Sequence, residues 1–381
     1  MQSYSAAPPA AASILYLAAA TCSFAAGDYG PALLWVERVI ALEPRHEEAQ
    51  ALRAAILARM RVEQPREAAA LPGNVFDPAQ RPWPAAAEQH PTRRWIAMET
   101  GYDSNVNSGT DSTQVSIPLL RGAPVDLERV LRILRGQSSY FLGSNAGIDA
   151  SRAITNATQF RLSGLAAMRV NVEEVEFVPH NYRIAAQVDH IHESLRFALG
   201  ASFAQQWIAR YRIVGVNALS AQIDWLAGAQ HTMSLFGEYA DKHLPQFNDI
   251  RTRQVHQGLA WTHIPTRLRV AIYTGQERAT GVTRDLDREF DGLSAGWDHR
   301  LSQSGRLSLT YLGSRSRYTE LSPFFLTKRR ETLHELTAAY EHRLRDAWFL
   351  TPRIIIQQNQ SNVELTRFSR TQLLIELRKE F

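Results

Sequence analysis

The chain has 381 residues, of which 45% are hydrophobic and 21% charged, a balance typical of folded proteins and not of disordered ones. Its formal net charge is +4, and its basic residues are nearly all arginines spread singly along the sequence, which argues against nucleic-acid binding. The single cysteine, Cys22, excludes an internal disulfide framework and a cysteine-ligated zinc site.

The hydropathy of the chain argues against membrane-spanning helices but is compatible with a transmembrane β-barrel. The mean hydropathy is -0.27, and no uninterrupted apolar run reaches the ~18 residues that a membrane-spanning helix needs. The strands of a transmembrane β-barrel escape this test, because only every second residue faces lipid. The composition therefore argues against helical spans and permits a barrel.

The chain begins with an apolar stretch over residues 13–26. A secretory signal peptide would carry a basic segment before such a stretch, yet the first basic residue is Arg38. A lipoprotein signal cleaved before Cys22 also fits poorly, since Ala19-Ala20-Thr21 is an indifferent match. A helical interpretation fits better.

Residues 1–62 are predicted to form a small α-helical module that resembles a tetratricopeptide repeat. A glycine allows the tight turn between antiparallel helices, a small alanine lets the helices approach, and a proline ends the second helix before a third begins near His46. The motif residues are Gly27, Tyr29, Ala32 and Pro44. Only about one and a half repeats are visible, whereas a solenoid needs about three. We expect the module to pack on the rest of the protein, or the chain to be incomplete at its N-terminus.

Residues 63–92 contain six prolines and no sustained hydrophobic period, which predicts a linker. From residue 93 to residue 381 the sequence changes to alternating apolar and polar residues, as in Leu195, Phe197 and Leu199 against Arg196 and Ser202. We count fourteen such runs, at 93–107, 138–152, 157–173, 181–192, 194–209, 212–226, 229–242, 250–264, 266–278, 289–303, 304–319, 329–345, 347–363 and 367–381.

The length and number of these runs favour a transmembrane barrel over a soluble β-sandwich. Most exceed the ~5–6 residues of soluble strands and reach the ~9–11 that cross a bilayer. The number is even, and short connections alternate with longer ones at 109–137, 243–249, 279–288 and 320–328. A helical segment at 125–134 is expected to be a loop or a plug-like turn. Aromatic residues at strand ends predict interfacial girdles: Trp95, Tyr102, Trp207, Tyr211, Trp261, Trp297, Tyr318 and Trp348.

The last run ends on an aromatic residue at the C-terminus and resembles the closing strand of bacterial outer-membrane barrels. Its apolar parity comprises Leu373, Ile375, Leu377 and Phe381, with Leu374 as the exception on the other parity. The resemblance implies that these residues form an assembly signal read by the barrel assembly machinery. We expect this strand to pair with the run at 93–107 and close the barrel.

No catalytic constellation is visible. His299 and Ser302 lie on opposite faces of a strand, and His190 and His192 share a face without a third ligand. Asp103, Asn105 and Asn107 also share a face and are interpreted as inward polar residues near a strand end. We therefore predict no catalytic, cofactor-binding or metal-ligating residues, and a protein that is not an enzyme.

Two stretches resemble the surface lipoprotein assembly modifier family, which joins tetratricopeptide repeats to a fourteen-strand outer-membrane barrel. They are AMETGYDSNVNSGTD at 97–111 and NQSNVELTRFSRTQLLIELRKEF at 359–381. The resemblance implies a barrel in the outer-membrane bilayer that moves a client lipoprotein or other polypeptide, bound by periplasmic repeats, along a basic polar interior. The alternatives are a glycan-export or diffusion porin and, more weakly, a barrel hydrolase.

Overall fold

The structure is a computed structural model. It describes residues 13, 16–21, 29–43, 45–63, 92–112, 114–116, 124–126, 135–173, 178–209, 211–245, 250–280, 286–322, 325–345 and 347–381. The chain divides into two compact units, one with the N-terminal helices and one with the strands.

The helical unit contains α2 (Tyr29–Leu42) and α3 (Glu47–Glu63). Fully buried side chains recur at helical spacing, with Ala32, Val36 and Val39 on α2 and Ala49 and Ile56 on α3. An ion pair of 2.5 Å between Arg53 and Glu37 links the two helices. None of the described helices is long and apolar enough to cross a membrane.

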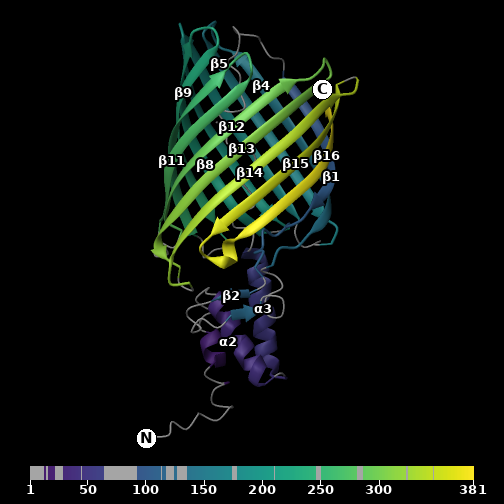
Figure 1. Ribbon diagram of the computed structural model, residues 1–381, viewed down its shortest axis with the longest axis vertical. Helices are drawn as coiled ribbons and strands as arrows, with labels where there is room; N and C mark the ends of the chain where they lie inside the picture. Colours follow the sequence, from purple (N-terminus) through teal and green to yellow (C-terminus); the bar gives the residue numbers. More distant parts are fainter. Residues whose placement is uncertain are drawn as a thin grey trace. The chain divides into compact units, whose positions relative to one another are not determined.

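Fourteen strands form a closed antiparallel barrel in which each strand pairs with its sequence neighbours (Figure 1). The strands are β1 (Arg93–Asp103), β4 (Ser139–Ala153), β5 (Thr158–Asn171), β6 (Pro179–His192), β7 (Leu195–Ile208), β8 (Tyr211–Ala227), β9 (His231–Leu244), β10 (Ile250–His263), β11 (Leu268–Ala279), β12 (Arg288–Arg300), β13 (Gly305–Leu321), β14 (Lys328–Arg343), β15 (Trp348–Ser361) and β16 (Phe368–Glu380). The predicted fold class is confirmed, since every one of the fourteen runs is a barrel strand.

The barrel closes where β1 pairs with β16, as the sequence predicts. The ladder runs from Trp95 opposite Glu380 to Asp103 opposite Gln372. We call this junction the seam. A carbonyl of β16 approaches β1 so closely here that a Cβ at Gly101 would lie 2.1 Å from the Leu373 oxygen. Glycine is therefore required at this point of the seam.

The two faces of the wall have opposite character. On β7, Leu199 is 66% exposed on the outer face, whereas Arg196 is 5% exposed on the inner face. Large apolar side chains such as Met98, Ile184 and Leu219 continue this outer surface. A closed barrel satisfies all strand hydrogen bonds internally, and its apolar exterior matches hydrocarbon. The chain is a bacterial outer-membrane β-barrel.

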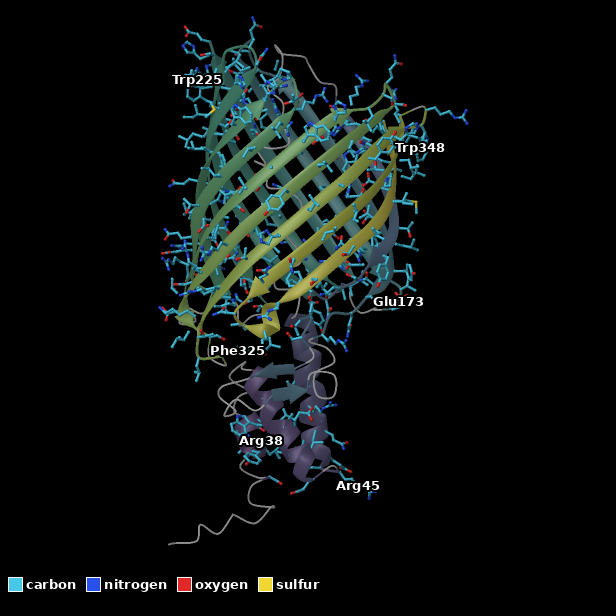
Figure 2. All side chains as sticks on the ribbon, viewed as in Figure 1. Arg38, Arg45, Glu173, Trp225, Phe325 and Trp348 are labelled. Atoms are coloured by element: carbon cyan, nitrogen blue, oxygen red, sulfur yellow. The ribbon has the colours of Figure 1, made fainter. Side chains whose placement is uncertain are left out.

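The two rims of the barrel differ in their connections. One rim, which we call the turn rim, carries short turns such as 228–230 and 264–267 together with Arg93 and Phe381. The other, the loop rim, carries the long connection 104–138 and the 280–287 loop. Trp225 and Trp348 mark the turn rim in Figure 2, and Glu173 and Phe325 mark the loop rim. Short turns are periplasmic in such barrels, which places the turn rim on the periplasmic side.

Three details differ from the sequence-based expectation. Trp95 and Tyr318 face inward and are not part of the aromatic girdles: a Cβ at Gly147 would lie 2.4 Å from the Trp95 ring, and Tyr318 is buried under the Arg329 guanidinium at 3.7 Å. Their strand parity, which places them among inward residues, overrides the interfacial preference of aromatic side chains. The expected turn at 125–134 begins instead in a short strand, β3 (Pro124–Asp126), paired with β2 (Gln114–Ser116), and its residues 127–134 lie outside the described residues.

Candidate functional site

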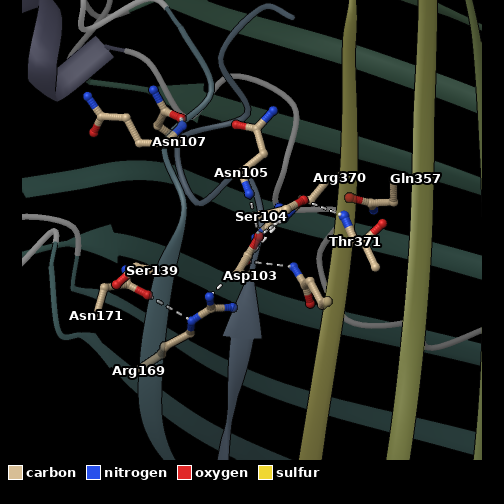
Figure 3. A network of polar contacts seen from close by, with 12 residues as sticks. Asp103, Ser104, Asn105, Asn107, Ser139, Arg169, Asn171, Gln357, Arg370 and Thr371 are labelled. Carbon is tan, nitrogen blue, oxygen red and sulfur yellow. Dashed lines mark hydrogen bonds and ion pairs between the residues drawn. The ribbon is translucent and has the colours of Figure 1, made fainter.

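A buried polar network locks the loop-rim end of the seam (Figure 3). Its centre is Asp103, the last residue of β1, whose side chain is fully buried. The Arg370 guanidinium of β16 donates to both carboxylate oxygens at 2.6 and 3.0 Å, and Arg169 of β5 donates at 2.7 Å. Gln372 adds a further donor at 3.1 Å. This buried carboxylate therefore joins three strands through charge-assisted hydrogen bonds.

Arg169 is held in place from a second side. Its guanidinium lies 3.6 Å from the centre of the Phe141 ring, a cation–π contact with a residue of β4 that is itself 1% exposed. Its Nε also donates to Asn171 at 3.1 Å. Through the inward-facing Phe141, β4 thus contributes to the same network as β1, β5 and β16.

Two asparagines extend the network into the connection that follows β1. The Asn105 amide donates to the carbonyls of Gly109 at 2.9 Å and Ser369 at 3.0 Å, and its oxygen accepts from the Gly109 N–H at 2.9 Å. Asn107 donates to the Arg135 carbonyl at 2.8 Å and accepts from the Gln137 N–H at 2.9 Å. These side chains satisfy backbone groups that have left the strand ladder.

The same segment is tied to the connection between β15 and β16, which contains the short helix η3 (Glu364–Thr366). The Thr110 hydroxyl donates to the Glu364 carbonyl at 2.7 Å, and the Asp111 N–H donates to the Arg367 carbonyl at 3.1 Å. We define the seam network as Asp103, Asn105, Asn107, Arg169 and Arg370. It fastens both sides of the seam and the start of the longest connection to one buried centre.

A carboxylate outside the strands is also fixed at the loop rim. Glu173 accepts hydrogen bonds from the Ser139 hydroxyl and from the Tyr140 N–H. Chiefly the Ser139 hydroxyl, and then this N–H, hold the pKa of Glu173 below its ordinary value. The charged carboxylate therefore ties the segment after β5 to the start of β4.

The inner wall carries further groups of paired charges. Toward the turn rim, Asp189 pairs with Arg161 at 2.9 Å, and Asp224 is bound by Arg196. Gln187 and Gln222 donate to the same two carboxylates at 2.6 Å each. Positive and negative groups thus alternate across β5, β6, β7 and β8.

Toward the loop rim, Glu277 of β11 is the centre of a second group. Lys242 lies 3.2 Å away, Arg288 lies 3.0 Å away, and the Thr252 hydroxyl donates at 2.6 Å. Arginines such as Arg161, Arg196 and Arg288 lie on the inner wall. The expected basic character of the interior is moderated, however, because carboxylates accompany these cations.

Several inward side chains keep contact with solvent despite their ion pairs. Arg353 is 32% exposed beside Glu376, Arg288 is 27% exposed beside Glu277, and Glu341 is 28% exposed beside Arg378. All three side chains lie on the inward parity of their strands. This arrangement provides a polar surface along the inside of the wall.

The predicted assembly residues lie on the lipid face of the closing strand. Leu373, Ile375 and Leu377 are 49%, 52% and 40% exposed, and Phe381 is 69% exposed with its N–H donating to the Arg94 carbonyl at 2.8 Å. Their role as an assembly signal stays a prediction. Leu374, the exception in the pattern, is buried on the inner side.

The repeat-motif residues are only partly within the described structure. Ala32 is buried and Tyr29 is the first residue of α2, whereas Gly27 and Pro44 lie outside the described residues, as do Cys22 and positions 64–91 of the expected linker. The tetratricopeptide assignment stays a prediction.

The histidines considered for chemistry are not gathered into a site. His190 and His192 are exposed on the outer face, and His299 stacks on Trp297 at 5.2 Å while Ser302 lies in the following turn. Within the part of the chain that the structure describes, no three His, Cys, Asp or Glu side chains are placed to hold a metal ion.

The sequence pattern identifies Asp103, Asn105 and Asn107 as inward polar residues, but it does not show that they form one network. The two stretches that carry the family resemblance, 97–111 and 359–381, meet in it, since Asp103 comes from the first and Arg370 from the second. The one signal for Arg370 in the sequence is its strand parity, which places it on the inward face of β16.

No protein-family model and no curated protein sequence matches the chain. Among solved structures, the chain is similar to OccAB3 of Acinetobacter baumannii, with 8% identity, a TM-score of 0.40, and coverage of 76% of this chain and 99% of that one. It is also similar to the outer-membrane protein OpdK of Pseudomonas aeruginosa, with 7% identity, a TM-score of 0.41, and coverage of 76% and 99%. A BenF-like porin from Pseudomonas fluorescens gives 7% identity, a TM-score of 0.42, and coverage of 76% and 98%.

Proposed function

We propose that this chain is a non-enzymatic transport barrel of the outer membrane. Its cargo is a lipoprotein or another polypeptide, which the helical unit binds in the periplasm before the cargo passes through the barrel interior. The observation that carries the proposal is the inner wall, where charged side chains are paired with one another and still reach solvent.

The number of strands supports an interior with room for cargo. A barrel of about 8 strands has an interior that side chains fill, whereas barrels of about 16–18 strands hold an aqueous channel. Fourteen strands lie nearer the second group. The partial exposure of Arg353 at 32% agrees with an interior that water enters.

Charge pairing suits passage better than retention. A polypeptide that moves along the wall meets arginines whose charge is already countered, such as Arg196 beside Asp224 and Arg288 beside Glu277. Opposite charges lie side by side among the described residues of this wall, so side chains of either charge can move past. The client therefore need not be acidic, unlike the client expected for a basic lumen.

The experiment is surface display of a lipoprotein encoded beside this gene, co-expressed with and without the chain. Display is measured by antibody labelling of intact cells, with total lipoprotein measured in lysed cells. The proposal expects labelling to depend on the chain at equal total lipoprotein. Equal labelling in both strains would exclude this lipoprotein as the client. A set of other periplasmic and surface polypeptides is then tested in the same way, and equal display of all of them would contradict polypeptide transport.

A diffusion channel for small polar solutes is the second candidate. The same observation favours it, because a wet wall with balanced charges admits small solutes of either sign. Swelling of proteoliposomes in sugars and amino acids separates the two functions. Fast swelling without any effect on surface display supports diffusion, and chain-dependent display, with or without swelling, supports polypeptide transport.

A further inference from the structure

Histidines gather at one rim of the barrel and face outward. The chain has twelve histidines, and of those that the structure describes, six lie at the turn-rim ends of strands on the outer face: His190, His192, His231, His263, His299 and His342. Polar side chains at the edge of an apolar wall lie at the depth of lipid headgroups. The turn rim is the periplasmic rim, so these imidazoles lie in the periplasmic leaflet.

Three strands end in the same pattern, an aromatic residue and a histidine two positions apart. The triplets are Trp261-Thr262-His263 on β10, Trp297-Asp298-His299 on β12 and Tyr340-Glu341-His342 on β14. A spacing of two places both side chains of each triplet on the same face of the strand. The Trp297 and His299 rings stack at 5.2 Å, and the Tyr340 and His342 rings stack at 6.1 Å.

On β9 and β10 the pattern extends across strands. His231 lies directly opposite His263, and their rings stack at 5.0 Å. The Trp261 Nε1–H donates to His231 Nδ1 at 3.3 Å, so the hydrogen of the neutral His231 ring is on Nε2. The Nε2–H is then left for another acceptor, and the neighbouring His263 ring, whose Nδ1 lies 2.7 Å from the Thr266 hydroxyl, carries a second N–H.

The charges around these rings favour an anion. The outward residues opposite them on the neighbouring strands are apolar, such as Leu268 beside His263 and Leu307 beside His299. The carboxylates within the triplets face inward and are paired, Asp298 with Arg306 at 3.6 Å and Glu341 with Arg378 at 2.6 Å. Basic residues occupy the adjoining turns, at Arg267 and Arg345. Arg300 and Arg343 end β12 and β14 on the inward parity, that of Asp298 and Glu341.

We propose that His231, His263, His299 and His342, the histidine belt, bind the phosphate groups of anionic phospholipids in the periplasmic leaflet. This binding strengthens in acid as His263, His299 and His342 gain protons, whereas His231, whose Nδ1 accepts from Trp261, acts as a neutral donor. The aromatic partners fix the rings at headgroup depth, and the imidazole N–H groups donate to phosphate oxygens. Each added positive charge then attracts the anionic headgroup over and above its hydrogen bond.

The test uses the whole protein reconstituted in phosphatidylcholine vesicles that contain brominated phosphatidylglycerol. Bromine quenches tryptophan fluorescence at contact range, and Trp261 and Trp297 lie beside the belt. Quenching gives the association constant of phosphatidylglycerol relative to phosphatidylcholine. It is measured at about pH 5.5 and about pH 7.5, on either side of the range in which imidazoles ordinarily titrate.

The relative association constant is expected to rise by at least roughly fivefold in acid, the effect of one added charge near an anionic surface. In the quadruple variant H231Q/H263Q/H299Q/H342Q, which keeps hydrogen-bonding side chains without the titration, the rise is expected to disappear. The matched control is H334Q, which removes an outward histidine of β14 that is bonded to Tyr311 away from the rim. An unchanged constant across pH in the natural protein overturns the proposal, even if the quadruple variant does not fold. So does a rise that the folded quadruple variant retains.

Discussion

At the scale of single residues, the structure predicts that the Asp103–Arg370 pair is a major source of seam stability. R370Q leaves the Asp103 carboxylate buried with fewer cations, and the loss of one partner from a buried pair costs about 3–5 kcal/mol. The free energy of unfolding in urea, measured in lipid vesicles, checks this. R317Q is the control, because Arg317 and Asp291 form an ion pair of 2.8 Å with side chains 50% and 47% exposed. Its loss should cost at most about 1 kcal/mol, and equal losses in the two variants would contradict the account.

A glycine pair gives a second prediction at this scale. In G101A the new Cβ would meet the Leu373 carbonyl oxygen at 2.1 Å, so the seam strands must move apart and the urea midpoint should fall. Gly215, in contrast, has nothing within 4 Å of an added Cβ, and G215A should leave the midpoint nearly unchanged. A midpoint for G101A equal to that of the natural protein would show that the seam is not closely packed at this point.

At the scale of the strand, a change at the end of β16 should affect assembly of the barrel without affecting its stability. Phe381 is 69% exposed, so its deletion removes little packing from the folded barrel. We predict that the deletion lowers the amount of folded, heat-modifiable protein in the outer membrane several-fold, while the urea midpoint of refolded protein stays within error. W348A, which removes an outward aromatic residue at the same rim, is the control for loss of an interfacial ring. A parallel fall in yield and midpoint would contradict an assembly role.

Strands were also the elements that sequence could predict. A period of two is a local property, so residues such as Leu195, Phe197 and Leu199 identified β7 without any knowledge of its neighbours. Boundaries were less accurate, as for β1, which ends at Asp103 and not near residue 107. The cause lies in the asparagine side chains, which satisfy the backbone after Asp103 and take it out of the ladder.

The candidate site could be predicted only in part, because it depends on register between distant segments. Strand parity placed Asp103 on an inward face, and the same signal was present for Arg370, but 266 residues separate the two in sequence. Only the closed ladder shows that Arg370 lies near Asp103 and that Arg169, from β5, reaches the same carboxylate. The inward positions of Trp95 and Tyr318 were misjudged because aromatic residues at strand ends were assigned to the girdles, although strand parity places both among inward residues.

At the scale of the whole molecule, the barrel wall contacts two different environments, lipid outside and water inside. Its outer face is apolar and matches the bilayer, while its inner face presents paired charges such as Arg196 with Asp224 and Arg353 with Glu376. Burial of so many ionised groups in a dry interior would be costly, and pairing with access to water removes most of that cost. We infer that this inner face surrounds a water-filled path across the outer membrane.

Electrical conductance across a planar bilayer shows whether the barrel contains such a water-filled path. Purified protein is shown to be folded by heat-modifiable mobility and is then added to a bilayer in salt solution under a constant voltage. Discrete, stable conductance steps are expected, since ions can follow a polar wall whose charges are already paired. Folded and inserted protein that gives no steps would contradict a water-filled path, and with it the transport function.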